Sequence, residues 1–448
     1  MTRVLVVGHV PLPFENLKKF YAPGARTWHF CEPLIADGHE LVMVGMRIPF
    51  VYDEDLPEVL KSEERGCTIY SVTPVEAESG GLLHDIVEKF EPECLLGVGA
   101  HPSYVAAVSG LELPLWADIN GCLLAEAQQK AAVYNDDSFL EHFYRIDHAV
   151  VIRADRFSTV ALRQKHELVG ELAFARRLTS KTSGYDFVAD IPNAYPDTPF
   201  SEEGAGMLRR RAPDDFLVLW SGGYNTWTDT KTLFEGLSYA VERDSRIKFV
   251  STGGSIDGHD ELTYPTLVKM VNSSPHRDRF LLEGWIDRDV ARSYYLACNV
   301  GINIDAETYE VVYGSRNRIM DWAVAGMPAL STDLCELTEE LAKEGIHVEV
   351  IDPRTLNPLD IDCIAKSVRK TGRLITVSEG YPRCGVGAEI SRQFMEYAFP
   401  DGSMGFDYLD AQPIMLSGKD CPIPMSEPLE DACVPTVKDI VEAVKGIV

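Results

Sequence analysis

The sequence has 448 residues, with 42 Lys and Arg against 69 Asp and Glu, and therefore a formal charge of −27 at pH 7. Its composition, 45% hydrophobic and 25% charged, is typical of soluble proteins, and its length exceeds the roughly 250–300 residues that one hydrophobic core supports. The negative charge weighs against binding to nucleic acid or to an anionic membrane, and no apolar run reaches the ~20 residues of a membrane-spanning helix.

The first half of the chain alternates apolar runs with helical patterns. A strand is expected at 4–7, followed by a proline-rich loop and by a helix that opens at Gly24-Ala25-Arg26-Thr27 and ends before Gly38-His39. Further strands are expected at 40–45, 94–98, 115–118 and 149–152. This alternation predicts an α/β domain with a parallel sheet over residues 1–195.

The second half repeats the alternation after a proline-rich stretch at 191–199, where we place the domain boundary. Strands are expected at 216–220, 248–252, 280–283, 300–304 and 329–331, and helices at 230–244, 290–297 and 316–325. The sequence thus predicts two Rossmann-like domains, the second over residues 196–400. The remainder, 401–448, is an acidic, proline-containing segment with a final helix at 437–445, and we expect it to pack back on the body.

The cysteines and the N-terminus indicate a compartment. Ten cysteines are scattered without a C-x-x-C pair or a histidine at metal-ligand spacing. The first strand begins at Val4, which leaves no room for the apolar core of a signal peptide. We therefore expect a cytoplasmic protein with reduced thiols. Whether the chain forms a homo-oligomer stays open.

The segment 300–331 carries the clearest ligand-binding pattern. A buried strand leads to Gly314-Ser315-Arg316-Asn317-Arg318, at the predicted start of a helix that contains Asp321. Free N–H groups and the dipole of a helix start favour phosphate, and an arginine adds a bidentate partner. Asp321 is placed to accept hydrogen bonds from ribose hydroxyls. The alternative is a capped helix with an Arg–Asp pair on the surface.

Two glycine-containing loops follow other strands of the second half. Gly222-Gly223-Tyr224-Asn225 lies between a strand and a helix, where paired glycines let the backbone approach a phosphate or a sugar. Gly284-Trp285-Ile286 closes another strand at the same carboxyl edge, where doubly wound sheets bind ligands. The alternative for the first loop is a tight turn that places Trp227 in the core.

Polar residues also end two strands of the first half. His101 follows one strand and can donate a hydrogen bond to a hydroxyl or a phosphate. Asp118 and Asn120 end the next strand, where Asp118 can orient an acceptor or take a proton. An isolated histidine is more often a structural residue, which is the alternative for His101. The chain contains no G-x-x-x-x-G-K-[ST], G-x-S-x-G or H-E-x-x-H motif.

Four segments resemble motifs of GT-B glycosyltransferases, especially the retaining enzymes of glycosyltransferase family 4. Gly24-Ala25-Arg26 resembles that family's N-terminal glycine loop, and Gly38-His39-Glu40 resembles its G-H-E turn. Ile191-Pro192-Asn193 resembles the interdomain P-N-G element, and Gly326-Met327-Pro328-Ala329 the A-x-G-x-P-V segment. The resemblance covers residues 1–345 in motif order and implies a GT-B fold, in which two Rossmann-like domains face each other across a cleft.

In this register the family has two glutamates with seven residues between them. The first contacts the donor sugar and the second contacts the nucleotide ribose. Asp321 fills the second place, whereas Tyr313 stands in the first. The resemblance therefore leaves Glu310 or Glu307 to reach the sugar.

The resemblance implies a transferase that moves a sugar from a nucleotide-diphosphate sugar to an acceptor nucleophile, with retention and without a metal. Catalytic roles then fall to His101, Asp118 and Glu310, and acceptor contacts to Gly24, Arg26 and Asn120. The donor contacts are expected from Gly222, Gly223, Tyr224, Asn225, Gly284, Trp285, Ile286, Gly314, Ser315, Arg316, Arg318 and Asp321.

Two other functions stay open. A GT-B epimerase or pseudo-glycosyltransferase shares the fold and is compatible with Tyr313 in place of the glutamate. A noncatalytic GT-B partner subunit is compatible with the same departure and with the acidic segment 401–435. The nucleotide, the sugar and the acceptor are not specified by the sequence, because main-chain groups often recognise them.

Overall fold

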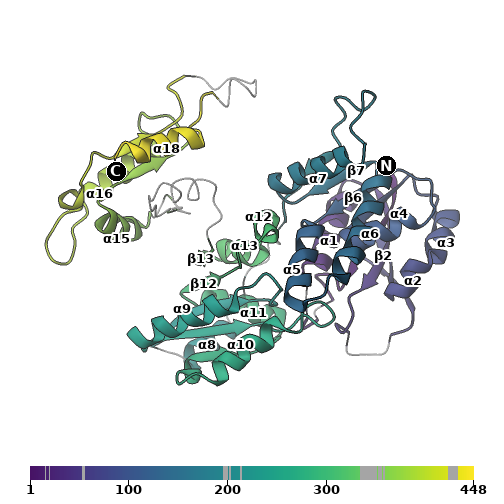
Figure 1. Cartoon of the computed structure of the whole chain (residues 1–448), viewed down its shortest axis with the longest axis horizontal. Helices are drawn as coiled ribbons and strands as arrows, with labels where there is room; N and C mark the ends of the chain where they lie inside the picture. Colours follow the sequence, from purple (N-terminus) through teal and green to yellow (C-terminus); the bar gives the residue numbers. More distant parts are fainter. Residues whose placement is uncertain are drawn as a thin grey trace. The chain divides into compact units, whose positions relative to one another are not determined.

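The computed structural model describes residues 1–15, 17–19, 21–52, 56–194, 200, 203–211, 214–332, 351, 356, 359–421 and 432–447. The chain divides into two compact units, Met1–Thr332 and Asp333–Val448 (Figure 1). The boundary predicted near residue 195 lies outside the described residues. The observed division falls instead within the range 196–400 that the sequence indicated as one domain, because the helices after residue 360 pack around a core of their own.

The first sheet contains eight strands in the order β3-β4-β2-β1-β5-β6-β7-β8, and all neighbours are parallel except β3 and β4. Its strands are β1 (Arg3–Val10), β2 (Glu40–Arg47), β3 (Val59–Glu64), β4 (Cys67–Val72), β5 (Cys94–Val98), β6 (Leu115–Ile119), β7 (Arg156–Thr159) and β8 (Val188–Asp190). Leu5 and Val7 belong to the core on one face, and Val4 and Val6 to the core on the other. The continuous apolar run of β1 is therefore buried on both faces.

Helices cover both faces of this sheet. They are α1 (Ala22–Ala36), α2 (Pro74–Ser79), α3 (Gly81–Phe90), α4 (Ala100–Val108), α5 (Leu123–Tyr134), α6 (Ser138–Arg153) and α7 (Leu162–Phe174). α1 packs through Trp28 on one face, whereas α6 and α7 pack through Val150 and Leu168 on the other. Since parallel strands share one carboxyl edge, the loops that follow β1, β5 and β6 lie together.

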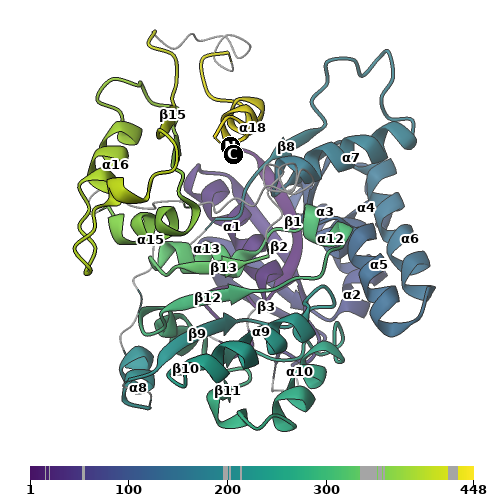
Figure 2. The same ribbon diagram turned by 60° about the vertical axis from the view of Figure 1, so that its left-hand side comes forward.

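The second sheet of unit 1 contains five parallel strands in the order β11-β10-β9-β12-β13, which Figure 2 shows side by side. Its strands are β9 (Phe216–Ser221), β10 (Ile247–Thr252), β11 (Phe280–Leu282), β12 (Val300–Asn303) and β13 (Ala329–Ser331). Along β9, Val218 and Trp220 face one core, whereas Leu217 and Leu219 face the other. This sheet is thus also buried on both faces, as parallel sheets require.

The helices of the second sheet divide between its two faces. They are α8 (Glu203–Arg211), α9 (Thr230–Arg243), α10 (Thr263–Asn272), α11 (Arg288–Ser293), α12 (Tyr309–Tyr313) and α13 (Asn317–Val324), with the 3-10 turns η1 (Arg277–Arg279) and η2 (Tyr294–Leu296). α9 and α10 pack through Leu233 and Leu267 on one face. α8 and α13 pack through Leu208 and Trp322 on the other.

Unit 2 has a small core of its own. A two-stranded parallel sheet, β14 (Ile375–Val377) and β15 (Ile414–Leu416), accompanies α15 (Ile361–Thr371), α16 (Val386–Met395), the 3-10 turn η3 (Gly405–Tyr408) and α18 (Val437–Lys445). Val368 of α15 and Phe394 of α16 lie in the main core. The predicted final helix is α18, whose Val441 and Val444 pack beside Ile375.

One predicted strand is wrong. Residues 149–152 lie in α6, and the strand that follows is β7, at Arg156–Thr159. Val150 and Val151 are buried, and a short apolar run has no period that separates a buried strand from the buried face of a helix. The other strands named above lie within a few residues of their predicted positions.

Two findings concern the environment of the chain. The cysteines among the described residues are free thiols, and the sulfur atoms of Cys421 and Cys433 lie 3.8 Å apart without a bond. In the same part of the chain, no helix is both long enough and apolar enough to span a membrane.

Candidate active site

The loops at the carboxyl edge of the second sheet form one side of the candidate site. Strand order reverses between β9 and β12, so the loops after these two strands flank a crevice of the kind that binds ligands in open α/β sheets. The loop after β9 begins with Gly222 and Gly223. The loop after β12 leads through α12 to Arg318, near the start of α13.

Glycines let the backbones of these loops pack together. A Cβ at Gly253 would overlap the carbonyl oxygen of Gly222, and a Cβ at Gly223 would meet Ile256 and Trp285. Gly222 also has a φ of 87°, in the left-handed region that favours glycine. The structure therefore places both predicted glycines beside the crevice, where close packing of the loops requires them.

Tyr224 does not face the crevice as the sequence indicated. Its ring is fully buried, stacks on Trp220 with a centroid distance of 4.6 Å, and forms a 2.8 Å hydrogen bond through its hydroxyl with Ser251. The neighbouring Trp227 is only partly buried, and the guanidinium of Arg316 lies 5.3 Å from the centroid of one of its rings. The core aromatic residue of this loop is thus Tyr224, not Trp227, because a tyrosine at this position reaches a buried hydroxyl partner.

Arg318 brings a buried cation to the crevice. Its guanidinium lies 4.0 Å from the centroid of a Trp220 ring, and Nη2 donates to the carbonyl oxygen of Gly223 at 2.7 Å. Nη1 is buried and has no hydrogen-bond partner among the residues that the structure describes. Burial lowers the pKa of Arg318 to about 10, so the side chain stays protonated at neutral pH. An anion that reached Nη1 would form a charge-assisted hydrogen bond with a group that otherwise lacks one.

Arg316 has a different role from the predicted phosphate contact. Its Nε donates to Asp305 at 2.7 Å, and its two Nη atoms donate to the carboxylate of Glu310 at 3.0 and 2.6 Å. The planar fork of the guanidinium is therefore already occupied by two carboxylates. Of the two arginines that the sequence indicated for the diphosphate, Arg318 is the one with a free donor.

The helix expected at 316–325 is α13, which begins at Asn317, so that Gly314 and Ser315 lie just before its start. Gly314 follows α12, and a Cβ there would overlap Arg316 and Glu310, so its role is to let this ion pair close. Ser315 is exposed in the same turn. The segment 314–316 therefore lies directly before the helix start, as the sequence predicted, and it serves the ion pair of Arg316 and Glu310; a phosphate contact there stays a prediction.

Two acidic side chains of unit 1 interact electrostatically, although their helices accompany different sheets. Glu310 lies on α12 and Glu126 lies on α5, which packs against α12. Burial raises the pKa of each to about 7, although Arg316 opposes both shifts. The carboxylate of Glu126 lies 3.4 Å from Nε2 of His259. No local motif marks Glu126 or His259, since one lies within a helical pattern and the other in a loop.

Asp321 lies on α13, close to the arginines of α11. Burial raises its pKa to about 6, and the positive charges of Arg292 and Arg288 oppose this shift. Near neutral pH the carboxylate is thus mostly ionised and able to accept hydrogen bonds from hydroxyl groups. This surrounding is compatible with the predicted contact to ribose.

The loop after β11 is fixed by Trp285. Its Nε1 donates to the carbonyl oxygen of Ser255 at 2.8 Å, and its ring makes an edge contact with Tyr21 at a centroid distance of 5.2 Å. Gly284 precedes it with a φ of 66°, whereas Ile286 packs against the core of the second sheet. Gly284 and Trp285 therefore stay candidates for contacts with a base, and Ile286 has a structural role.

Asp118 is enclosed at the end of β6. It is fully buried and accepts from Nε and Nη2 of Arg26 at 3.0 and 2.8 Å and from Ser158 at 2.6 Å. Arg26 also donates to the carbonyl oxygens of Ile191 and Pro192 at 2.8 and 3.0 Å. Asp118 therefore holds Arg26 against the segment that leaves the first sheet, and this enclosure speaks against direct proton transfer to a substrate.

We expect Asp118→Ala to lower the free energy of unfolding by about 3–5 kcal/mol, because it leaves the buried guanidinium of Arg26 without a countercharge. Urea denaturation of the full chain measures this loss. Glu91→Ala, which removes the exposed partner of Arg3, is the matched control and should change stability by at most ~1 kcal/mol. Equal losses in the two variants would contradict a structural role of the Arg26–Asp118 pair.

The remaining residues predicted for the acceptor side lie near this pair in the sequence. A Cβ at Gly24 would overlap the carbonyl oxygen of Pro11, so this glycine allows α1 to approach the loop after β1. Asn120 is partly buried directly after β6. Asn225, on the donor side, is also partly buried, and its backbone N–H donates to Thr228 at 3.3 Å.

His101 lines a cavity of about 360 Å³ that contains several basic side chains. Its Nε2 lies 2.9 Å from the carboxylate of Glu78. Lys130, His142 and His259 line the same cavity. Burial lowers the pKa values of these three groups. Positively charged neighbours lower the pKa values of the two histidines further, and that of His259 is about 4. The sequence indicated only His101, whereas the fold gathers four basic residues here.

The described residues contain no group of three or more His, Cys, Asp or Glu side chains arranged to hold a metal ion. Metal independence itself stays a prediction.

Residues 327–440 match the family model of the transketolase C-terminal domain. The chain is 46% identical over 108 residues to the pyruvate dehydrogenase E1 component subunit beta of Rhizobium meliloti (strain 1021), which covers 24% of this chain and 22% of that protein. It is 47% identical over 110 residues to the mitochondrial pyruvate dehydrogenase E1 component subunit beta of Mus musculus. This match covers 25% of this chain and 29% of that protein. The chain thus spans less than a third of the length of either relative.

Solved structures of glycosyltransferases with the GT-B fold are similar to most of the chain. Sucrose-phosphate synthase from Thermosynechococcus elongatus matches with a TM-score of 0.53 and 15% identity, over 83% of this chain and 89% of that one. The UDP-forming α,α-trehalose-phosphate synthase from Burkholderia vietnamiensis has a TM-score of 0.53 and 12% identity, over 74% of this chain and 84% of that one. The corresponding synthase from Burkholderia xenovorans, solved in complex with glucose-6-phosphate, has a TM-score of 0.51 and 11% sequence identity. This match also covers 74% of this chain and 84% of that one.

These likenesses concern the fold. They agree with the predicted α/β class, with parallel sheets and with a GT-B architecture, but they do not identify glycosyltransferase family 4. The match to the transketolase domain was not predicted. It begins at Met327, close to the division between the two units, and accounts for most of unit 2.

Proposed function

We propose that the chain is a glycosyltransferase that moves a sugar from a nucleotide-diphosphate sugar to an acceptor nucleophile with retention. The observation that carries this proposal is Nη1 of Arg318, a buried donor for which the described residues offer no partner, beside Gly222 and Gly223 at the crevice of the second sheet. A diphosphate offers the acceptor oxygens that this donor lacks. The UDP-forming synthases with a similar fold support this donor class.

The donor is held at one sheet edge by α13 and by the loops that follow β9 and β11. Arg318 contacts the diphosphate, Asp321 accepts from the ribose hydroxyls, and the base lies against the loop of Gly284 and Trp285. Because the guanidinium is stacked on Trp220, it is fixed in place before the ligand arrives. Such preorganised charge stabilises the departing diphosphate more than it stabilises the ground state.

The reacting sugar lies between Glu310 and Glu126. Glu310 is positioned by Arg316, and Glu126 by its proximity to His259. With a pKa near 7, the carboxyl group of Glu126 can exchange a proton with an acceptor hydroxyl at neutral pH. Glu310 thus keeps the catalytic role that the sequence gave it, and Glu126 takes the acid–base role first considered for Asp118. Retention is supported by a trehalose-6-phosphate synthase of similar fold, which was solved with bisubstrate glycomimetics to explain glycosyl transfer with retention.

The acceptor is an anion in this proposal. Lys130 is buried, and its amino group forms no ion pair or hydrogen bond that the described residues show, although it lies 4.9 Å from the ring centroid of Phe139. Together with His101, His142 and His259 it lines the basic cavity, where its ammonium group offers a positive partner, and the imidazoles offer hydrogen bonds, to a phosphate or carboxylate. A synthase of similar fold was solved with glucose-6-phosphate, a substrate of this chemical class.

Binding of a nucleoside diphosphate is expected to raise the melting temperature. At 100 times its Kd, a ligand that binds only the folded chain stabilises it by about 2.7 kcal/mol. Thermal shift with UDP, GDP, ADP and TDP tests this, and Arg318→Ala is the matched variant in which the shift should disappear. If no nucleoside diphosphate at millimolar concentration shifts the wild-type chain, the donor site is wrong.

A second function is favoured by the match over residues 327–440. We propose that unit 2 is a module of the transketolase C-terminal type that accompanies the transferase without contributing to its chemistry. Arg369 of this unit, which pairs with Asp401 at 2.7 Å, is a suitable probe. Arg369→Ala should leave the binding of nucleoside diphosphates unchanged, and a loss comparable to that of Arg318→Ala would contradict this division of roles.

A further inference from the structure

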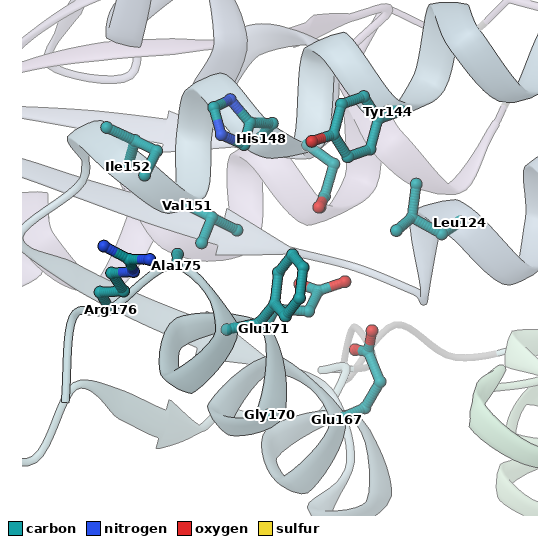
Figure 3. A pocket seen from close by; sticks show the side chains of 12 residues that line it. Leu124, Tyr144, His148, Val151, Ile152, Glu167, Gly170, Glu171, Ala175 and Arg176 are labelled. Carbon is teal, nitrogen blue, oxygen red and sulfur yellow. The ribbon is translucent and has the colours of Figure 1, made fainter.

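A second cavity, of about 570 Å³, lies between α5, α6 and α7, and none of its lining residues belongs to the site described above. Figure 3 shows Tyr144 and His148 of α6 on one side and Glu167 and Glu171 of α7 on the other. Gly170 lies in the middle of α7, and a Cβ there would meet no atom within 4 Å. A glycine inside a helix costs about 1 kcal/mol relative to alanine, and here it keeps the cavity open.

The floor of this cavity is acidic. Asp147 is only 9% exposed and lines the cavity, yet no described residue donates a hydrogen bond to it. Glu167 and Glu171 lie one helical turn apart on the facing helix, and Glu167 accepts from the thiol of Cys122 at 3.4 Å. Three carboxyl groups thus converge, and the most deeply buried of them lacks a donor among the described residues.

Burial and the like charges of the neighbouring carboxyl groups raise the pKa values of both Asp147 and Glu171. The titratable and charged groups that line the cavity with Asp147 are Glu167 and Glu171 on α7, Tyr144 and His148 on its own helix, and Arg176 after α7. The thiol of Cys122, before α5, contacts Glu167. The three carboxyl groups therefore cannot all ionise near neutral pH unless a further positive charge enters the cavity.

The rim of the cavity is apolar and aromatic. Phe174 is 88% exposed, which is unusual for a phenylalanine, and Ile152 and Tyr144 are each 47% exposed. Aromatic faces beside carboxylates form a common setting for organic ammonium ions, which use both the negative charge and the ring quadrupole. A metal ion fits less well, since the described residues include no group of side chains arranged as metal ligands.

We propose that this cavity binds an organic amine, with its ammonium group at Asp147 and Glu171 and its apolar body against Phe174 and Tyr144. Binding exchanges a carboxyl proton for the ammonium ion, so affinity depends on the ionised fraction of Asp147. This fraction increases as pH rises, because burial and the neighbouring carboxyl group of Glu167 raise the pKa of Asp147. The site is independent of the proposed transferase activity.

Isothermal titration calorimetry of the full chain with 2-phenylethylamine tests the proposal, and 2-phenylethanol serves as the neutral probe of the same shape. We expect the amine to bind at least about tenfold more tightly than the alcohol at pH 8, and more weakly at pH 6 than at pH 8. Two variants locate the site. Asp147→Asn removes the charge and should lower affinity about tenfold, and Gly170→Leu fills the cavity and should abolish binding.

Glu88→Gln, in the exposed part of α3, is a control of equal charge change and should leave the affinity unaltered. Melting curves of each variant establish that it is folded, and Asp147→Asn should not lower stability because it relieves repulsion among the three acids. The proposal is overturned if the amine and the alcohol bind equally, if neither binds, or if folded Asp147→Asn and Gly170→Leu keep the wild-type affinity. Binding of a lysine-rich peptide but not of the amine would also overturn it, in favour of a protein partner.

Discussion

Replacing Arg318 by alanine is expected to lower kcat/KM for sugar transfer by about 100- to 1,000-fold, which is the usual cost of removing one preorganised donor from a site where negative charge develops. The size of the effect follows from the position of the guanidinium. It is buried, stacked on Trp220 and tied to the carbonyl oxygen of Gly223, so no other described cation is held in the same place. Steady-state kinetics of diphosphate release measure the loss.

Arg243→Ala is the matched control for this prediction. Arg243 also stacks on an aromatic ring, that of Tyr239, but on the exposed surface of α9 and away from the loops of the sheet edge. Its removal should leave kcat/KM unchanged. If the Arg318 and Arg243 variants have the same activity, Arg318 does not hold the diphosphate, and the donor site at the β9–β12 crevice must be abandoned.

Glu126→Gln is expected to flatten the acidic limb of the pH profile. Burial raises the pKa of Glu126 to about 7. In the wild-type chain this carboxyl group therefore becomes protonated as pH falls below 7, and it can then no longer accept a proton from the acceptor. kcat/KM should then fall about tenfold per pH unit on that side. In Glu126→Gln the activity should drop about 100-fold or more at pH 8 and should fall less steeply than in the wild type as pH falls below 7.

Glu235→Gln serves as the control for the pH experiment, because Glu235 lies exposed on α9 opposite Lys231. It should keep the wild-type profile. A Glu126→Gln variant with an unchanged acidic limb would show that another group titrates, and Glu310, whose pKa is also about 7, would then be the first to replace.

Raised carboxyl pKa values also affect folding. Since Glu126 binds its proton more tightly in the folded chain, its contribution to stability is lost as pH rises through 7.

The sheets could be predicted from the sequence because their strands are short apolar runs bounded by glycine and proline. β5 was predicted with both bounds, and β13 likewise. The run at 149–152 failed for a physical reason: its valines are buried on a helix, and four residues are too few to show a helical period. The division at Thr332 also escaped prediction, since the alternation of apolar and polar segments continues across it.

The site was predictable only where glycines and strand ends mark it. Gly222, Gly223 and Arg318 lie where the sequence placed them, at one carboxyl edge. The ion pairs of Arg316 and Asp118 could not be predicted, because a charged side chain looks the same in sequence whether it meets a ligand or a buried partner. Both are engaged by opposite charges in the fold.

Contacts between segments far apart in the chain could not be predicted at all. Glu126 interacts with Glu310 and with His259, which lie more than a hundred residues away in sequence. Their raised or lowered pKa values arise from burial that only the assembled fold creates. The basic cavity has the same origin, because it unites side chains of helices α4 to α6 with His259 of the loop after β10.

Mass spectrometry of the purified full chain, incubated with UDP-, GDP-, ADP- and TDP-sugars and with glucose-6-phosphate as an anionic acceptor, tests the proposed transfer most directly. We predict that one donor is consumed only when acceptor is present, that a nucleoside diphosphate is released, that the acceptor gains the mass of one sugar residue, and that Arg318→Ala forms no product. Conversion of a donor to an isomer without acceptor would contradict transfer and indicate an epimerase. Full recovery of every donor, from a chain whose melting temperature none of the nucleotides shifts, would contradict a nucleotide-sugar enzyme altogether.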